Sequence, residues 1–116
     1  MKGLSKIGVG LYQGEESDAG DLKLFEVLEF ALLNGVHVFD CAPSSRNCRS
    51  ENVLGRLTRM YPDRDYFIST KGGFVPFDFS QGEEKENAYV QELFERGWVR
   101  PSHFDQEYFQ TFDPVF

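Results

Sequence analysis

One aspartate and one lysine stand where two apolar segments end, and they are the residues of this chain best suited to chemistry. Asp40 follows the segment 36–39, and Lys71 follows the segment 66–70. Where two such segments are neighbouring parallel strands, the residues at their carboxyl ends meet in the cleft that α/β folds use for chemistry. A buried acid beside a buried amine would hold a charge ready for proton transfer. The same contact would equally serve as a structural salt bridge.

The surrounding pattern predicts the elements that place this pair. Three apolar segments predict short strands: residues 7–12, 36–39 and 66–70. The stretches between them predict two helices, one from Asp21 to Asn34 and one that ends before Pro62. Ser50 is the expected N-cap of the second helix, with Glu51 in its first turn. Strands and helices that alternate in this way form right-handed β-α-β units around a parallel sheet, which defines an α/β fold.

Each predicted helix carries an apolar stripe that is expected to be buried. The stripes consist of Leu22, Leu24, Phe25, Val27, Leu28, Ala31 and Leu32 in the first helix, and Val53, Leu54, Leu57 and Met60 in the second. Consecutive right-handed crossovers put both helices on one face of the sheet. The other face and the edge of the third strand then need cover, from the tail of this chain, from a second copy or from another chain.

The last third of the chain has a different character. We divide the sequence into residues 1–80, which carry the β-α-β-α-β pattern, and an irregular acidic and aromatic tail, residues 81–116, with a short helix over 88–96. Residues 82–116 contain three basic and eight acidic side chains. This imbalance suits a solvated segment or a surface that binds a basic partner.

Composition excludes several classes of protein. The chain has 116 residues and a net charge of −7, which disfavours nucleic-acid binding because that depends on basic side chains. No apolar run is long enough to cross a bilayer, and no secretory pattern opens the sequence, so we expect a soluble cytoplasmic protein. Cys41 and Cys48 are expected to be free thiols. His37 and His103 are too isolated to predict a metal site.

Four ordered blocks of residues resemble the N-terminal portion of the aldo-keto reductases. They are Gly8–Tyr12, Asn34–Ala42, Arg49–Gly55 and Ile68–Lys71. The resemblance covers about residues 4–78. It implies part of a (β/α)8 barrel, as in a TIM barrel, and an oxidoreductase that reduces carbonyls with NADPH. A β-α-β protein that shares the strand-end acid and lysine by chance is a further interpretation, which four blocks in order disfavour.

The resemblance assigns roles to individual residues. Asp40 matches the catalytic aspartate and Lys71 the catalytic lysine of the family, while Gly10 and Tyr12 match positions near the nicotinamide. The family's general acid is a tyrosine whose pKa the lysine lowers, and Ser45 stands at that position. An aliphatic hydroxyl starts from a much higher pKa than a phenol.

Two interpretations follow. The chain is either a truncated, inactive or very weak reductase with poor affinity for NADP, or a non-catalytic pseudoenzyme that binds a small molecule or a protein. The expected partners are a carbonyl substrate, if the chain is active, and a second copy or another chain that completes the sheet. His103 does not follow an apolar strand, so we do not assign it as the family's active-site histidine.

Overall fold

The computed structural model describes residues 3–75, 83–98, 104–105 and 108–110, and it divides the chain into two compact units. The first unit is Met1–Gly72 and the second is Gly73–Phe116. The division therefore falls at Gly72, earlier than the boundary near residue 80 that composition suggests. Each unit is described by itself.

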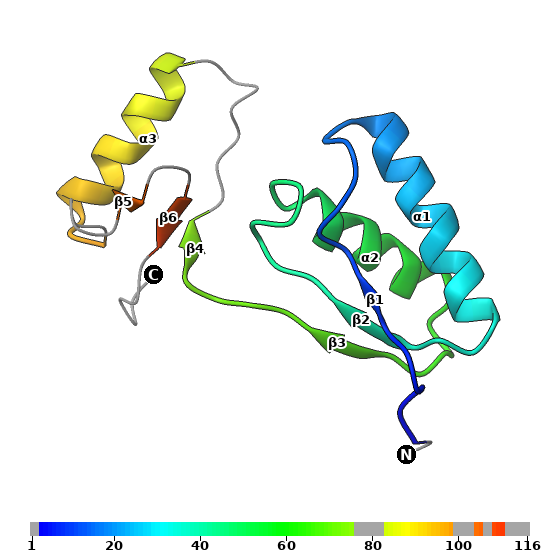
Figure 1. The fold of residues 1–116 in the computed structure, drawn as a ribbon. Coiled ribbons are helices and arrows are strands. Elements are labelled where there is room, and N and C mark those ends of the chain that lie inside the picture. Colours follow the sequence, from blue (N-terminus) through cyan, green and yellow to red (C-terminus); the bar gives the residue numbers. More distant parts are fainter. Residues whose placement is uncertain (1–2, 76–82, 99–103, 106–107, 111–116) are drawn as a thin grey trace. The chain divides into compact units, whose positions relative to one another are not determined.

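The first unit is a parallel three-stranded sheet with two helices. Its elements are β1 (Val9–Gly10), α1 (Asp18–Leu33), β2 (Val38–Asp40), α2 (Arg49–Met60) and β3 (Phe67–Ser69). The strand order is β1-β2-β3, and both strand pairs are parallel. Both helices lie on the same side of this sheet (Figure 1). The α/β fold with β-α-β-α-β order, expected from the sequence, is confirmed as a partial barrel unit.

The core of the first unit lies between the sheet and the two helices. Phe39 in the central strand is fully buried, and the side chains packed around it come from all the neighbouring elements. The core consists of Leu11, Phe25, Leu28, Leu32, Phe39, Cys41, Val53, Leu54 and Leu57. Removing this apolar surface from water at about 25 cal/mol per Å² is the main source of stability for such a unit.

The helices begin differently from the sequence prediction. Helix α1 starts at Asp18 because the hydroxyl of Ser17 accepts a hydrogen bond from the amide of Gly20 at 3.0 Å, which caps the first turn. Helix α2 starts at Arg49, after Cys48 in a left-handed conformation (φ 65°). The prediction that Ser50 is the N-cap is therefore wrong. Its hydroxyl instead donates to the carbonyl of Leu11.

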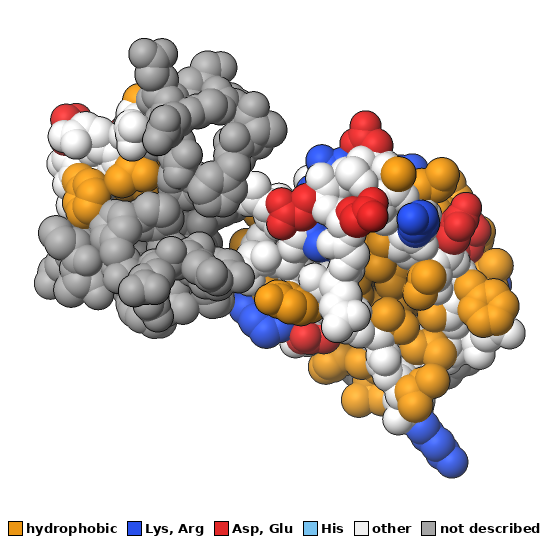
Figure 2. Space-filling model, turned by 45° about the horizontal axis from the view of Figure 1, so that its top comes forward, with side chains coloured by type: hydrophobic (Ala, Val, Ile, Leu, Met, Phe, Trp, Pro, Cys, Tyr) orange, Lys and Arg blue, Asp and Glu red, His pale blue; other side chains and the backbone are white. Residues whose placement is uncertain are grey.

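Three residues assigned to the buried stripes are exposed. Leu22 and Val27 of α1 are each 55% exposed, and Met60 at the end of α2 is 58% exposed. Helix α1 carries apolar residues around most of its circumference, and only the side that faces the sheet and α2 is covered. Apolar side chains consequently lie at the surface of this unit (Figure 2).

The second unit contains a small antiparallel sheet and one helix. The strands β4 (Phe74–Val75), β5 (Phe104–Asp105) and β6 (Tyr108–Gln110) are arranged in the order β4-β6-β5. Helix α3 (Glu83–Glu95) begins before the segment 88–96 that the sequence indicates. Among the side chains of α3 that the structure describes, Leu93 is buried, whereas Tyr89 is 37% exposed.

Candidate active site

The central feature of the first unit is a contact between the ends of β2 and β3. The ammonium nitrogen of Lys71 lies 3.0 Å from Oδ1 and 3.1 Å from Oδ2 of Asp40, and it also donates to the carbonyl oxygen of Cys41 at 3.0 Å. The ammonium group has three N–H donors, so these three oxygens use all of them. Any further acceptor must displace one of these bonds.

The strand register explains why the two side chains meet. Asp40 is paired with Ser69, and residues that alternate along a strand point to the same face. Ser69 and Lys71 therefore both point toward Asp40, on the face of the sheet opposite the helices. The amide of Cys41 donates to the carbonyl of Ser69 at 2.9 Å, which continues the ladder to this end of the sheet.

The pair is exposed, contrary to the expectation of a buried acid beside a buried amine. The side chain of Asp40 is 56% exposed and that of Lys71 is 47% exposed. No described element of the first unit covers this face of its three-stranded sheet, so within that unit both groups are accessible to water. An exposed pair of this kind contributes only about 0–1 kcal/mol to stability. It is a weak structural salt bridge that a ligand can disturb at little cost.

The charge of Lys71 nevertheless acts on Asp40. Hydrogen bonds from Lys71 and Ser69, together with the positive charge of the ammonium, lower the pKa of the Asp40 carboxyl below its ordinary value of 3.8. The carboxylate is therefore ionised throughout the neutral range. A group in this state accepts hydrogen bonds and orients the lysine, and it does not supply a proton.

Ser45 lies in the turn that follows β2, and it is buried. Its side chain is 4% exposed, and its amide donates to the carbonyl of Ala42 at 2.9 Å. Among the described contacts, no hydrogen bond joins Ser45 to Lys71. Ser45, which stands at the position of the family's tyrosine, is thus not joined directly to the lysine.

The same turn is held in an unusual backbone conformation. Arg46, Asn47 and Cys48 have φ values of 51°, 52° and 65°, in the left-handed region that non-glycine residues rarely adopt. Each such residue costs about 1–2 kcal/mol, and a run of three persists only where other contacts fix it.

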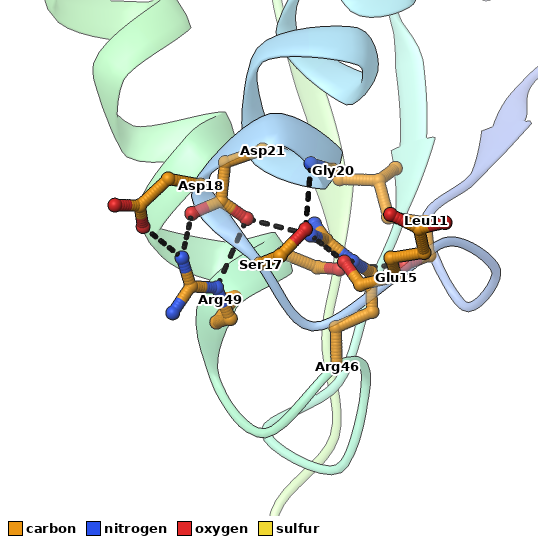
Figure 3. Close-up of polar contacts among 9 residues, drawn as sticks. Leu11, Glu15, Ser17, Asp18, Gly20, Asp21, Arg46 and Arg49 are labelled. Carbon is orange, nitrogen blue, oxygen red and sulfur yellow. Dashed lines mark hydrogen bonds and ion pairs between the residues drawn. The ribbon is translucent and has the colours of Figure 1, made fainter. Parts of the chain in front are cut away.

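Arg46 supplies those contacts. Its guanidinium donates to the carbonyl oxygen of Glu15 and to Oδ1 of Asp21, the latter at 2.6 Å, and its side chain is 1% exposed (Figure 3). Arg49 adds ion pairs to Asp18 and Asp21 at 2.5 and 2.8 Å. The turn after β2 is therefore tied to the first turn of α1.

Electrostatics within this cluster favour the ionised carboxylate. Partial burial of Asp21 by itself would raise the pKa of its carboxyl. Hydrogen bonds and positive charge from Arg49 and Arg46 outweigh that effect, so the pKa of Asp21 lies below its ordinary value of 3.8. The Asp21 carboxylate is thus ionised at neutral pH, and the cluster fixes the two loops.

The end of β1 forms the remaining side of the site. A Cβ atom added at Gly10 would meet no atom within 4 Å, and Tyr12 is 68% exposed. Gly10 is paired with Asp40 across the sheet, which places it next to the acid–lysine pair. The space over Gly10 would admit a flat ring close to the backbone.

Comparison with known proteins decides what this arrangement is. A model of the aldo/keto reductase family matches residues 6–103 of the chain. The chain belongs to the aldo/keto reductase family. This match extends past residue 78, where the resemblance in the sequence ends, and includes α3. No curated protein and no solved structure matches the chain closely enough to count as a relative.

Membership relates the chain to oxidoreductases whose members generally use NADP(H), so the described residues can be compared with that cofactor. The open position at Gly10 and the exposed ring of Tyr12 suit the flat nicotinamide. Phosphate groups need free cationic side chains, whereas Arg46, Arg49 and Lys71 all bind carboxylates. The fit is therefore limited to one end of the cofactor.

The sequence did not indicate the roles of two residues of the site, Arg46 and Ser50. Arg46 carries the contacts that hold the turn after β2, and Ser50 joins α2 to the end of β1. The residues next to Arg46 gave no sign of its carboxylate partner, because Asp21 lies 25 positions away in the sequence. The predicted roles of Asp40, Lys71, Ser45, Gly10 and Tyr12 remain predictions, and His103 lies outside the described residues.

Among the described residues, no helix is long and apolar enough to cross a membrane. The same part of the chain contains no group of three or more histidine, cysteine or acidic side chains that would hold a metal ion.

Proposed function

We propose that this chain carries the acid–lysine part of an aldo/keto reductase active site and reduces carbonyls with NADPH very slowly or not at all. The observation that supports this is the contact of the Lys71 ammonium with both carboxylate oxygens of Asp40, at 3.0 and 3.1 Å, in a chain of this family. The pair lies beside the open backbone of Gly10, where the flat end of the cofactor would bind.

The proposed chemistry needs a proton at the carbonyl oxygen while the cofactor supplies hydride to the carbonyl carbon. Lys71 is the described donor that we place against that oxygen. To do so, its ammonium must give up one of its three present acceptors, and the exposed bond to Asp40 is the cheapest to lose. Lys71 would then polarise the carbonyl while Asp40 keeps the ammonium oriented, and the alkoxide formed by hydride transfer would take its proton from water.

Weak activity follows from the state of Ser45. Its hydroxyl has an intrinsically high pKa, its side chain is buried, and no hydrogen bond connects it with Lys71. General acid catalysis contributes about 10²- to 10⁴-fold, and we expect the chain to lack that factor. A pseudoenzyme that binds a small molecule or a protein is the second candidate function, favoured by this buried serine and by the exposed apolar side chains of the first unit.

The partners and location belong to the same proposal. A second copy of the chain, or another chain, would cover the open face of the sheet, where Phe67 is 49% exposed. Cys41 and Cys48 are both free, which suits a reducing compartment such as the cytoplasm. Size-exclusion chromatography with light scattering tests the second copy, because a strictly monomeric chain would contradict self-association.

Fluorescence titration of purified chain with NADPH tests the proposed cofactor site. We expect weak saturable binding to the wild type, weaker binding to Lys71→Ala, and unchanged binding to Lys6→Ala, which removes the same charge from an exposed lysine outside the site. Reduction of an aromatic aldehyde by Ser45→Tyr would then be measured against wild type. Absence of binding up to millimolar NADPH would overturn the reductase proposal and leave the binding module.

A further inference from the structure

A second polar contact holds the end of β3 from the opposite face of the sheet. The hydroxyl of Thr70 donates to Oε1 of Glu51 at 2.6 Å. Glu51 lies in the first turn of α2, and Thr70 directly follows the last residue of β3, Ser69. The contact therefore joins a helix to the strand end that carries Lys71.

Side chains alternate between the two faces of the sheet along residues 69–71, so this segment can be held from both faces. Ser69 and Lys71 point to the open face, where both interact with Asp40, and Thr70 points to the helix face, where Glu51 lies. The segment 69–71 is thus held from both faces, by β2 on one side and α2 on the other. Lysine has a flexible stem with several rotatable bonds, so its ammonium can sample many positions. Fixing the backbone at Lys71 narrows that range and keeps the ammonium close to both oxygens of Asp40.

We propose that Glu51 is a positioning residue, which acts through the hydroxyl of Thr70 to hold Lys71 against Asp40. The proposal rests on the proposed function only where it names Asp40 and Lys71 as the active pair. The physical claim concerns how well the ion pair is formed, and it can be measured without cofactor or substrate.

Glu51 also has a second way to act on this region. Its negative charge helps, after burial, to raise the pKa of the Cys41 and Cys48 thiols, so its field reaches the residue next to Asp40. The charged groups that face this corner are Glu51, Asp40 and Lys71, together with the two thiols. A useful test must therefore separate the hydrogen bond of Glu51 from its charge.

Three substitutions make that separation. Thr70→Val removes the hydroxyl and keeps the charge of Glu51, whereas Glu51→Gln removes the charge and keeps an acceptor for Thr70. Thr70→Ser keeps both and is the conservative rescue. Thr70 is exposed, so its replacement leaves the core intact.

The readout is the titration of the Asp40 carboxyl in the full 116-residue chain, followed by carboxyl carbon NMR and assigned with Asp40→Asn. In the wild type we expect a midpoint below 3.8. Thr70→Val should raise the midpoint by about 0.5 pH unit, the size of an exposed ion pair, while Thr70→Ser and Glu51→Gln stay near the wild type.

Two results would overturn the proposal. An unchanged midpoint in Thr70→Val would show that the contact does not position Lys71, and an equal rise in Thr70→Ser, which keeps the hydroxyl, would show that the hydroxyl is not responsible. If Thr70→Val lost its fold by circular dichroism, Glu51→Ala would remove the same bond from the helix side and should raise the midpoint relative to Glu51→Gln, which lacks the same charge and keeps an acceptor. Failure of NADPH binding would contradict the proposed function and leave this titration result standing.

Discussion

The hydroxyl of Ser50 donates a hydrogen bond to the backbone carbonyl of Leu11 at 2.7 Å, and both side chains are fully buried. This bond ties the first turn of α2 to the end of β1, while the amide of Leu11 donates to the carbonyl of Asp40 at 2.9 Å. Leu11 is therefore fixed on both sides. Through it, Gly10 and Tyr12 are held in register with Asp40.

Replacing Ser50 with alanine should destabilise the first unit. The substitution deletes a buried donor and leaves the carbonyl of Leu11 without that partner, which costs about 1–3 kcal/mol. Urea unfolding followed by circular dichroism measures the change. Ser44→Ala, in the turn after β2, is the control and should fall within about 0.5 kcal/mol of the wild type. Equal stability of the Ser50→Ala and Ser44→Ala chains would show that the Ser50 hydroxyl contributes little.

A second prediction concerns the ion pair between Arg46 and Asp21. Asp21→Asn removes the charge that faces a guanidinium whose side chain is 1% exposed, while the amide oxygen still accepts one bond. We expect a loss of about 2 kcal/mol at pH 7, less than the full cost of breaking a buried pair because Asp21 is 20% exposed. Asp18→Asn is the matched control, since Asp18 is fully exposed and its pair with Arg49 should be worth less than about 1 kcal/mol.

The same variant has a distinct pH dependence. The folded state lowers the pKa of the Asp21 carboxyl, so its contribution to stability is present above 3.8, the ordinary value, and is lost as the pH falls through the lower folded value. The difference between wild type and Asp21→Asn should therefore shrink between pH 5 and about pH 2. A difference that stays constant over this range would assign the effect to packing rather than to charge.

The fold was accessible from the sequence because its signals are local. Apolar strand segments and helix stop signals such as Asn34–Gly35 predicted the β-α-β-α-β order, and Asp40 and Lys71 follow their strands as expected. The helix starts were missed because serine is a good capping residue wherever it precedes a helix. Ser17 and Ser50 both fit that pattern, and only Ser17 acts as a cap. The hydroxyl of Ser50 is instead engaged by a carbonyl from a distant strand.

The site was harder to predict from the sequence, because it depends on long-range contacts and on which residues cover the sheet. Whether Asp40 and Lys71 are exposed depends on which residues, if any, cover the open face of the sheet. The sequence pattern within residues 36–71 carries no information on that cover. The partnership of Arg46 with Asp21 likewise joins two loops that are far apart in the sequence. Periodicity identifies which face of an element is apolar, but not which apolar residues remain exposed, as Leu22 and Met60 show.

The two thiols should differ in reactivity. Burial raises the pKa of both, with the charge of Glu51 adding to the effect, but Cys41 is 2% exposed whereas Cys48 is partly accessible. We expect iodoacetamide at pH 8 to modify Cys48 at least about tenfold faster, because Cys41 reacts only after the core opens. Mass spectrometry of Cys48→Ser and Cys41→Ser chains measures each rate. Equal modification rates of Cys41 and Cys48 in the folded chains would contradict this explanation. So would protection of both thiols from iodoacetamide that persists when urea unfolds the chain.

Two helical glycines should respond in opposite directions to alanine. Gly55 lies within α2, and a Cβ atom there would meet only the flexible end of Arg59, at 3.4 Å. Gly55→Ala should therefore gain about 0.5–1 kcal/mol from helix propensity. Gly20 lies in the first turn of α1, where a Cβ atom would overlap the carbonyl oxygen of Glu15 and lie 3.0 Å from the guanidinium of Arg46.

Because that carbonyl is itself bound by Arg46, the loop before α1 cannot move aside without breaking the contact that holds the turn after β2. Gly20→Ala should then cost about 1–3 kcal/mol, as overpacking does, despite the same gain in propensity. Thermal unfolding of the two variants and of the double variant measures both effects, which should add because the sites share no partner. A stabilised Gly20→Ala chain would mean that the loop yields easily and that Arg46 does not lock it.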